Sequence, residues 1–288
     1  MLYLLFCIVC SSVLYIIFKA FETYKIDMLQ AIVVNYLVAG SLGFILANGY
    51  GNNISMDHLL HADWSRYTLL IGLMFISIFS LMGISSQKVG VATTSVANKM
   101  SVVLPVIFGI AFLREVITSV KIIGIILAVL ALVLTTFKKE KRETGKLILY
   151  PVIIFFASGI LDIILGYCSK TYINETNTVA FTASLFSIAA IIGFLFLLVL
   201  IIQKRQKIKS KNILAGIILG VPNFGSILFS FEGIKATQWD VSVFYPVLNM
   251  GVVVMATLLG WVVYKEKLSM LNLAGIFLSV LAIYFISF

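Results

Sequence analysis

Long apolar stretches separated by short polar segments make up almost the whole chain. The stretches fall at roughly residues 2–20, 28–48, 66–86, 91–113, 117–137, 147–168, 178–202, 213–234, 240–263 and 269–287. About 20 apolar residues suffice for an α-helix to cross the hydrocarbon core, whereas a transmembrane barrel would show alternating segments of about ten residues. The pattern therefore predicts an all-α integral membrane protein with ten transmembrane helices.

The composition agrees with this prediction and excludes a soluble fold. Of the 288 residues, 61% are hydrophobic and 11% are charged, whereas a soluble domain is about half apolar and a quarter charged. The mean hydropathy is +1.10. A water-soluble protein of this size has no means of hiding so much apolar surface.

A basic segment, KKEKRETGK at residues 138–146, divides the ten stretches into two sets of five. We therefore predict a first five-helix repeat at residues 1–137, a basic linker, and a second five-helix repeat at residues 147–288. Because each half has an odd number of helices, the second half runs through the bilayer in the opposite direction. Such inverted repeats are the architecture of many secondary transporters.

The two halves also share polar residues at matching positions. A shift of 151 residues superposes four identical pairs: Gln87 on Gln238, Asn98 on Asn249, Glu115 on Glu266 and Gly124 on Gly275. Each glutamate is followed at the third position by a hydroxyl residue. We predict that the two glutamates cap the helices that follow them and form interfacial salt bridges.

Residues 93–132 and 239–287 each combine a small, hydroxyl-rich helix containing a proline, a turn with glutamate, and a final helix containing glycine. Both segments resemble the end of an EamA-type repeat of the drug/metabolite transporter superfamily. They depart from it at Arg114 and Lys265, where a glycine often precedes the glutamate. The resemblance implies a ten-helix carrier of small metabolites, and we expect it in a cell membrane, specifically a bacterial plasma membrane.

Ionisable residues inside the apolar stretches are the first candidates for a substrate site, because charge at membrane depth is costly. Lys99 lies about 12 Å into its helix, among threonines, serines and Asn98. It either faces a cavity and meets an anionic group or extends to the headgroups. Asp162 has apolar neighbours on both sides. It is a candidate proton carrier, a partner of Lys99, or a structural polar group at a helix end.

Amide and aromatic residues complete the predicted site. The predicted substrate-binding residues are Lys99, Asn98, Asp162, Asn249, Asn223, Asn35 and Tyr245. Three prolines, Pro105, Pro222 and Pro246, are predicted to break their helices, most strongly in the segment GVPNFGS at residues 220–226. Gly216 and Gly220 form a GxxxG pattern, which we interpret as close helix packing.

Other chemistry is not predicted. His58 and His61 form an HxxH pattern, but two such residues in a loop are weak evidence for a metal, and we interpret them as part of an interfacial turn. We expect no metal, no cofactor and no catalytic residue. The net charge of +9 comes largely from short basic runs that flank the spans, so membrane lipids are the expected partners and nucleic acid is not.

The predicted function is secondary transport of small organic metabolites or drugs by alternating access, in the direction of export, with proton coupling as one option. The alternative is a flippase for lipid-linked headgroups or a membrane assembly subunit. An enzyme is not expected, and the protein acts as a monomer or homodimer. Fifteen Lys and Arg residues on the linker side against five on the other place the linker in the cytoplasm, whereas the resemblance implies cytoplasmic termini.

Overall fold

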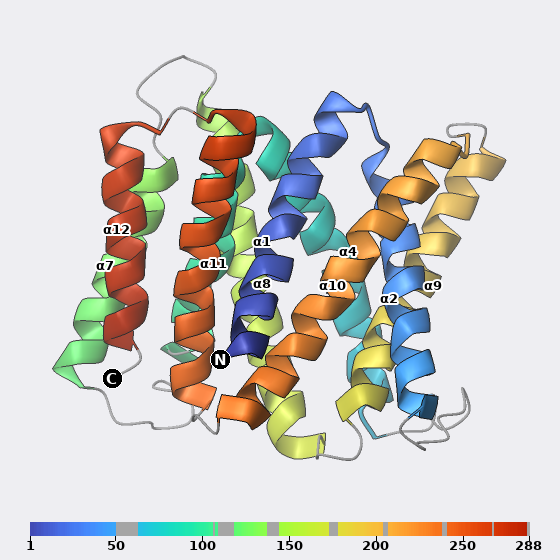
Figure 1. Ribbon diagram of the computed structural model, residues 1–288, viewed down its shortest axis with the longest axis horizontal. Helices are drawn as coiled ribbons and strands as arrows, with labels where there is room; N and C mark the ends of the chain where they lie inside the picture. Colours follow the sequence, from blue (N-terminus) through green and yellow to red (C-terminus); the bar gives the residue numbers. More distant parts are fainter. Residues whose placement is uncertain are drawn as a thin grey trace. The chain divides into compact units, whose positions relative to one another are not determined.

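The structure is a computed structural model. It describes residues 1–49, 63–105, 107–108, 118–136, 144–172, 178–203, 207–237, 241–266 and 268–286. The regular structure of these residues is helical (Figure 1). The helices are α1 (Leu2–Thr23), α2 (Met28–Gly49), α4 (Ser65–Lys88), α5 (Val91–Met100), α7 (Ser119–Thr136), α8 (Thr144–Tyr172), α9 (Thr178–Ile202), α10 (Ser210–Thr237), α11 (Val241–Tyr264) and α12 (Met270–Ile286).

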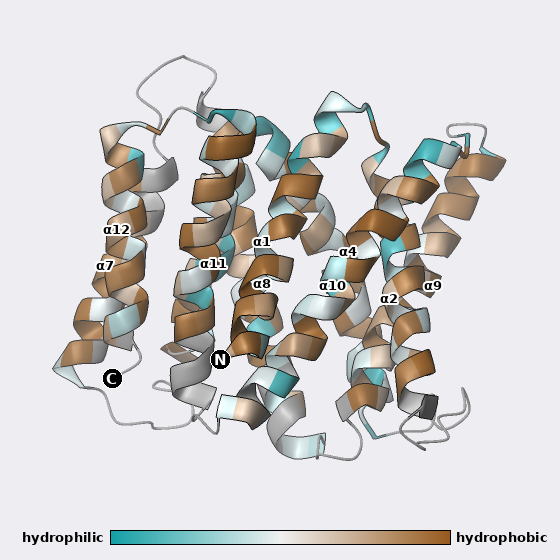
Figure 2. Ribbon diagram, viewed as in Figure 1, coloured by the Kyte–Doolittle hydropathy of each residue, from teal (hydrophilic) through white to brown (hydrophobic). Residues whose placement is uncertain are grey.

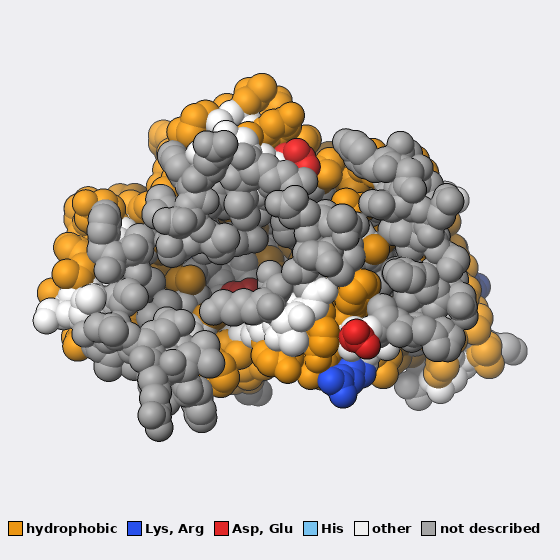
Figure 3. Space-filling model, turned by 90° about the horizontal axis from the view of Figure 1, so that it is seen from below, with side chains coloured by type: hydrophobic (Ala, Val, Ile, Leu, Met, Phe, Trp, Pro, Cys, Tyr) orange, Lys and Arg blue, Asp and Glu red, His pale blue; other side chains and the backbone are white. Residues whose placement is uncertain are grey.

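Many of these helices are long and apolar enough to cross a membrane. Within the described residues there are seven such stretches: Leu2–Thr23, Met28–Leu46, Ser65–Lys88, Leu147–Leu165, Val179–Ile202, Ser210–Ser230 and Val247–Tyr264. Shorter apolar helices occur in α7 and α12. Hydrophobic residues follow the helices along their length (Figure 2) and cover much of the described surface in Figure 3. The prediction of an all-helical membrane protein is thus confirmed for the described residues.

The chain divides into two compact units, and each unit combines segments from both halves of the sequence. The first unit contains Met1–Glu22, Leu81–Ile160 and Gly225–Phe288. The second unit contains Thr23–Ser80 and Leu161–Phe224. Helices α4, α8 and α10 therefore contribute residues to both units, and α1 contributes its last residue, Thr23, to the second unit. The predicted division of the sequence at residues 138–146 stays a prediction.

In the first unit, α7 packs along α12, and α5 packs against α7 and α11. The core between them consists of aliphatic residues and one phenylalanine: Val96, Met100, Val103, Ala128, Phe155, Val253, Ala282 and Ile283. Helix α1 lies against α11, because a Cβ atom at Gly251 would come within 2.4 Å of Ile8. At the other end of α11, the Tyr264 hydroxyl donates a hydrogen bond to the carbonyl of Ile16 at 2.9 Å.

In the second unit, α2 packs closely against both α9 and α10. A Cβ atom at Gly216 would lie 2.6 Å from the carbonyl oxygen of Ala31, and one at Gly220 would lie 2.9 Å from that of Asn35. Because these are backbone atoms of α2, only glycine permits this approach. The interpretation of the GxxxG pattern as a packing surface is confirmed. On the α9 side, Gly40 faces Ser187 at a similarly short distance.

The three prolines behave differently from one another. Helix α5 ends at Met100, and the Leu104 amide then donates to the Ser101 carbonyl at 2.9 Å, because Pro105 has no N–H to continue the α-helical pattern. By contrast, α10 continues through Pro222 and α11 through Pro246. The predicted breaks are wrong at these two positions, since losing one donor leaves the other helical hydrogen bonds intact.

Candidate functional site

The most polar helix of the first unit, α5, is buried among apolar helices. Thr93, Thr94 and Ser95 are at most 4% exposed. Their hydroxyl groups find local partners: Thr94 donates to the carbonyl of Gly90 at 2.8 Å and Ser95 to that of Ala92 at 2.9 Å. These bonds explain how a hydroxyl-rich helix is tolerated in an apolar unit.

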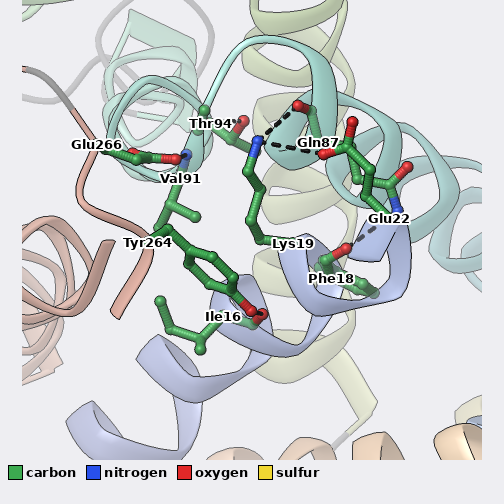
Figure 4. Close-up of polar contacts among 10 residues, drawn as sticks. Ile16, Phe18, Lys19, Glu22, Gln87, Val91, Thr94, Tyr264 and Glu266 are labelled. Atoms are coloured by element: carbon green, nitrogen blue, oxygen red, sulfur yellow. Dashed lines mark hydrogen bonds and ion pairs between the residues drawn. The ribbon is translucent and has the colours of Figure 1, made fainter. Parts of the chain in front are cut away.

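Glu266 holds the beginning of α5. Its Oε1 atom accepts a hydrogen bond from the Val91 amide at 3.0 Å (Figure 4). Gly90, with φ of 121°, allows the close approach, because a Cβ atom there would lie 3.4 Å from the carboxylate in a backbone conformation that side chains disfavour. Glu266 thus satisfies an amide that would otherwise lack a partner at the start of a helix.

This arrangement corrects one prediction. We expected Glu266 to cap the helix that follows it, which is α12, but it caps α5 from the other half of the sequence. Ser269 caps α12 instead: its hydroxyl accepts from the Asn272 amide at 3.1 Å, and Asn272 Oδ1 accepts from the Ser269 amide at 3.2 Å. Glu115, the matching glutamate, lies outside the described residues.

Beside the start of α5, reciprocal hydrogen bonds join the ends of α1 and α4. The Lys19 ammonium group donates to the Gln87 carbonyl at 2.7 Å and lies 3.4 Å from Glu22, while Gln87 Nε2 donates to the Phe18 carbonyl at 3.0 Å (Figure 4). The side chain of Gln87, one of the residues matched between the two halves, thus joins helices.

A polar pocket of about 260 Å³ opens at this end of the first unit. It is lined by residues from α1, α4, α5, α12 and the connection after α11: Lys19, Gln87, Lys88, Val89, Gly90, Ala92, Thr93, Glu266, Leu268 and Asn272. The pocket therefore places two lysines and a carboxylate at the first turn of α5.

Further along α5, Asn98 connects three helices. The Tyr15 hydroxyl donates to Asn98 Oδ1 at 2.9 Å, and Asn98 Nδ2 donates to the Ser158 hydroxyl at 2.9 Å. Tyr15 lies on α1 and Ser158 on α8, and both are buried. The amide of Asn98 is thus engaged by protein groups, and a ligand would have to replace one of them.

Lys99 is half-buried at the next position, about 12 Å along α5 from Val91. It lies close enough to Cys7 of α1 for electrostatic interaction. In the same unit, Asn249 is half-buried on α11. Tyr245 is part of α11, but the position of its side chain lies outside what the structure describes.

The other predicted residues belong to the second unit. Asn35 of α2 and Asn223 of α10 are 0% and 2% exposed, and Asn223 Nδ2 donates to Asn35 Oδ1 at 3.1 Å. The Nδ2 group of Asn35 is buried without a hydrogen-bond partner. Asp162, which we predicted to be part of the substrate site, is exposed on α8 and is not enclosed by other helices. Its pairing with Lys99 stays a prediction.

An aromatic cluster occurs at one end of the second unit. The Arg66 guanidinium group donates to the Tyr172 hydroxyl at 3.2 Å and lies over the ring of Tyr67. Tyr67 in turn contacts Tyr167 and Tyr172. The hydrogen bond from Arg66 lowers the pKa of Tyr172, which follows the membrane span of α8. Tyrosine and arginine at the end of a span are typical of a membrane interface.

Some residues of these clusters were not predicted. Tyr15, Ser158, Lys19 and Glu22 interact with residues far away in the sequence or at helix ends. For a single tyrosine or serine in an apolar stretch, the sequence spacing does not distinguish a residue that binds another polar group from one that only fills space in the core. His58 and His61 lie outside the described residues.

The apolar helices and their buried polar residues define an integral membrane protein with polar sites among its helices. Comparison with known proteins gives the family. The model of the EamA-like transporter family matches residues 1–137 and 149–288, and the chain belongs to this family. It is a multi-pass transmembrane protein of the drug/metabolite transporter type.

Individual similar proteins cover the chain from end to end. An uncharacterised protein of Haemophilus influenzae is 29% identical, over 98% of this chain and 96% of its own length. A solved crystal structure of another protein has a TM-score of 0.62 at 16% identity and covers 99% of this chain and 96% of that one. The second likeness concerns the fold alone.

Proposed function

We propose that the protein is a secondary transporter that moves a small organic metabolite or drug out of the cell by alternating access. Its ten transmembrane helices would form two inverted repeats. Family membership supports transport in general, and the 151-residue spacing of the paired glutamines, asparagines and glutamates supports the repeat. A bacterial plasma membrane is the location we propose.

The observation that carries this proposal is the burial of a charged and hydroxyl-rich helix inside an apolar unit. Thr93 of α5 lines the polar pocket, and Asn98 and Lys99 follow on the same helix. A lysine at this depth is costly unless it interacts with something of opposite polarity. We propose that Lys99 binds an anionic or strongly polar group of the substrate when the helices around α5 open.

Proton coupling is the second part of the proposal. Asp162 is exposed on α8, within the apolar span Leu147–Leu165. Carboxyl groups within membrane spans are a common element of proton relays in transporters. We propose that Asp162 takes up and releases a proton during the transport cycle.

The experiment begins by finding the substrate. Metabolites inside and outside cells that express or lack the protein are compared, and a compound whose distribution changes is then measured in proteoliposomes. Lys99→Met should abolish its transport while membrane insertion is retained, and Lys211→Met is the matched control. Lys211 is an exposed lysine whose ammonium group donates to the carbonyl of Tyr24, so its loss should leave transport within about twofold of wild type.

Full activity of Lys99→Met would remove Lys99 from the site. Transport of the compound with no response to an imposed proton gradient, in wild type and in Asp162→Asn alike, would exclude proton coupling. Absence of any compound that responds to expression in either direction would contradict the proposal as a whole.

A further inference from the structure

The second unit contains a basic pocket that the proposed transport function does not use. Its volume is about 440 Å³, within the range typical of small-molecule sites. It lies where the connection between α1 and α2 meets the connection between α9 and α10, and it is lined by Lys25, Ile26, Asp27, Gln30, Lys207, Lys209 and Asn212. Three lysines against one aspartate leave the pocket with two net positive charges.

Two buried amides fix the part of the loop that carries Lys207 and Lys209. Gln30 and Asn212 are 3% and 1% exposed. Gln30 Nε2 donates to the Lys207 carbonyl at 3.0 Å, and Gln30 Oε1 accepts from the Lys209 amide at 3.3 Å and from Asn212 Nδ2 at 2.7 Å. These bonds hold the backbone on both sides of Ile208, and with it the starting points of the two lysine side chains, beside Gln30.

The aspartate of the pocket, Asp27, already accepts a hydrogen bond from the first turn of α2. Asp27 Oδ1 accepts from the Gln30 amide at 3.0 Å, and the Asp27 amide donates to Asn212 Oδ1 at 3.1 Å. Asp27 thus caps α2 and connects it to the first turn of α10. Lys25, two residues before Asp27, has a left-handed backbone conformation with φ of 50°. The three lysines of the pocket therefore lie around a carboxylate that is already engaged in capping α2.

The location of the pocket indicates what kind of anion it binds. The apolar spans Met28–Leu46 and Ser210–Ser230 begin one to three residues from the pocket lysines. Apolar side chains are exposed in these two connections and at the end of α9: Tyr24 is 70% exposed, Ile208 60%, and Ile202, the last residue of α9, 71%. Charged groups beside exposed apolar side chains at the end of a span match the boundary between lipid headgroups and acyl chains.

We propose that this pocket binds the phosphate headgroup of an anionic phospholipid such as phosphatidylglycerol. Lys25, Lys207 and Lys209 would contact the phosphate, and Ile202 and Ile208 the adjoining acyl chains. The basic charge and the adjacent apolar side chains together favour a lipid over a soluble anion, which would gain nothing from the apolar contacts. The site is independent of the substrate that the protein transports.

The test uses the full-length protein in detergent, titrated with phosphatidylglycerol and followed by native mass spectrometry. A lysine near an anionic lipid contributes roughly fivefold in affinity, so Lys207→Gln/Lys209→Gln should weaken phosphatidylglycerol binding about 25-fold. Lys211→Gln removes a charge from the same end of α10 but outside the pocket lining, and it should change binding less than about threefold. Phosphatidylcholine should bind wild type and both variants equally.

Three outcomes would overturn the assignment. One is equal loss of phosphatidylglycerol binding in the Lys211 variant, which would show a diffuse charge effect. A second is displacement of the lipid by inorganic phosphate at equal concentration, which would make the pocket a site for a soluble anion. The third outcome needs only the wild-type protein and so applies even if the double variant does not fold. It is that the wild type binds phosphatidylglycerol no better than phosphatidylcholine at low salt.

Discussion

The hydrogen bond between Tyr15 and Asn98 can be tested by a double-mutant cycle, because its two partners can be removed separately. Tyr15→Phe deletes only the hydroxyl group, and Asn98→Leu replaces the amide with an apolar side chain of similar size. If the 2.9 Å contact joins α1 to α5, each substitution should cancel part of the effect of the other. Asn98 also binds Ser158, and this second bond is unaffected by Tyr15→Phe.

The size of the effect follows from the two hydrogen bonds. Hydrogen bonds between membrane helices contribute about 0.6 kcal/mol on average and up to roughly 1.7 kcal/mol. Asn98→Leu loses both bonds and leaves the hydroxyl groups of Tyr15 and Ser158 buried without this partner, so we expect the free energy of unfolding to fall by about 1–3 kcal/mol. Tyr15→Phe should cost about 0.6–1.7 kcal/mol, and the coupling between the two changes should be about as large.

The measurement is equilibrium unfolding of the four proteins in mixed detergent micelles, monitored by circular dichroism. Independent sites add to within about 0.5 kcal/mol, so a coupling energy below that value would refute the hydrogen bond. A stabilising Asn98→Leu would refute the view that Asn98 joins helices, and would return it to the set of residues kept for a ligand. Transport measured on the same four proteins separates the two roles, since a purely structural bond affects amount and stability rather than substrate affinity.

Two further predictions concern helix packing and capping. Gly216→Ala should lower the free energy of unfolding by about 1–3 kcal/mol, because the new Cβ atom would lie 2.6 Å from the Ala31 carbonyl oxygen. Gly225→Ala is the control and should cost less, because the nearest atom to its Cβ would be a side-chain sulfur at 3.2 Å. Equal thermal stabilities of the two variants would contradict the close contact between α2 and α10. Glu266→Leu should cost about 1 kcal/mol by removing the acceptor of the Val91 amide, and Glu266→Gln, which keeps an acceptor oxygen, should cost less than half of that in the same unfolding assay.

The sequence predicts the helices well, because helices in a membrane are defined by local apolar length. The spans of α1, α2, α4 and α9 each agree with a predicted stretch to within a few residues. The interruption after α5 was also predictable, since a missing N–H at Pro105 acts on the turn immediately before it. The GxxxG surface is equally local, as glycine at two successive turns admits another backbone whatever lies opposite.

Contacts between distant segments were not predictable in the same way. The spacing of Glu266 and Ser269 is that of a local helix cap, yet the carboxylate binds α5 while the serine caps α12. Both arrangements satisfy unpaired amides at a helix start, and only the packing of the unit decides between them. The exposure of Asp162 was unpredictable for the same reason, because its apolar neighbours along α8 do not indicate whether another helix covers that side of α8.

The predicted site residues separate into two kinds when their partners are considered. Asn98 and Asn223 donate to other side chains within their own units, so their amides already contribute to the packing of α5 and α10. Asn35 keeps a buried Nδ2 group without a partner, which costs free energy in an apolar unit unless another state of the protein satisfies it. The alternating access that we propose would provide such states, because helices that separate during transport would expose buried donors to water or substrate. Asn35 is therefore a better candidate for direct substrate contact than the two amides that have protein acceptors.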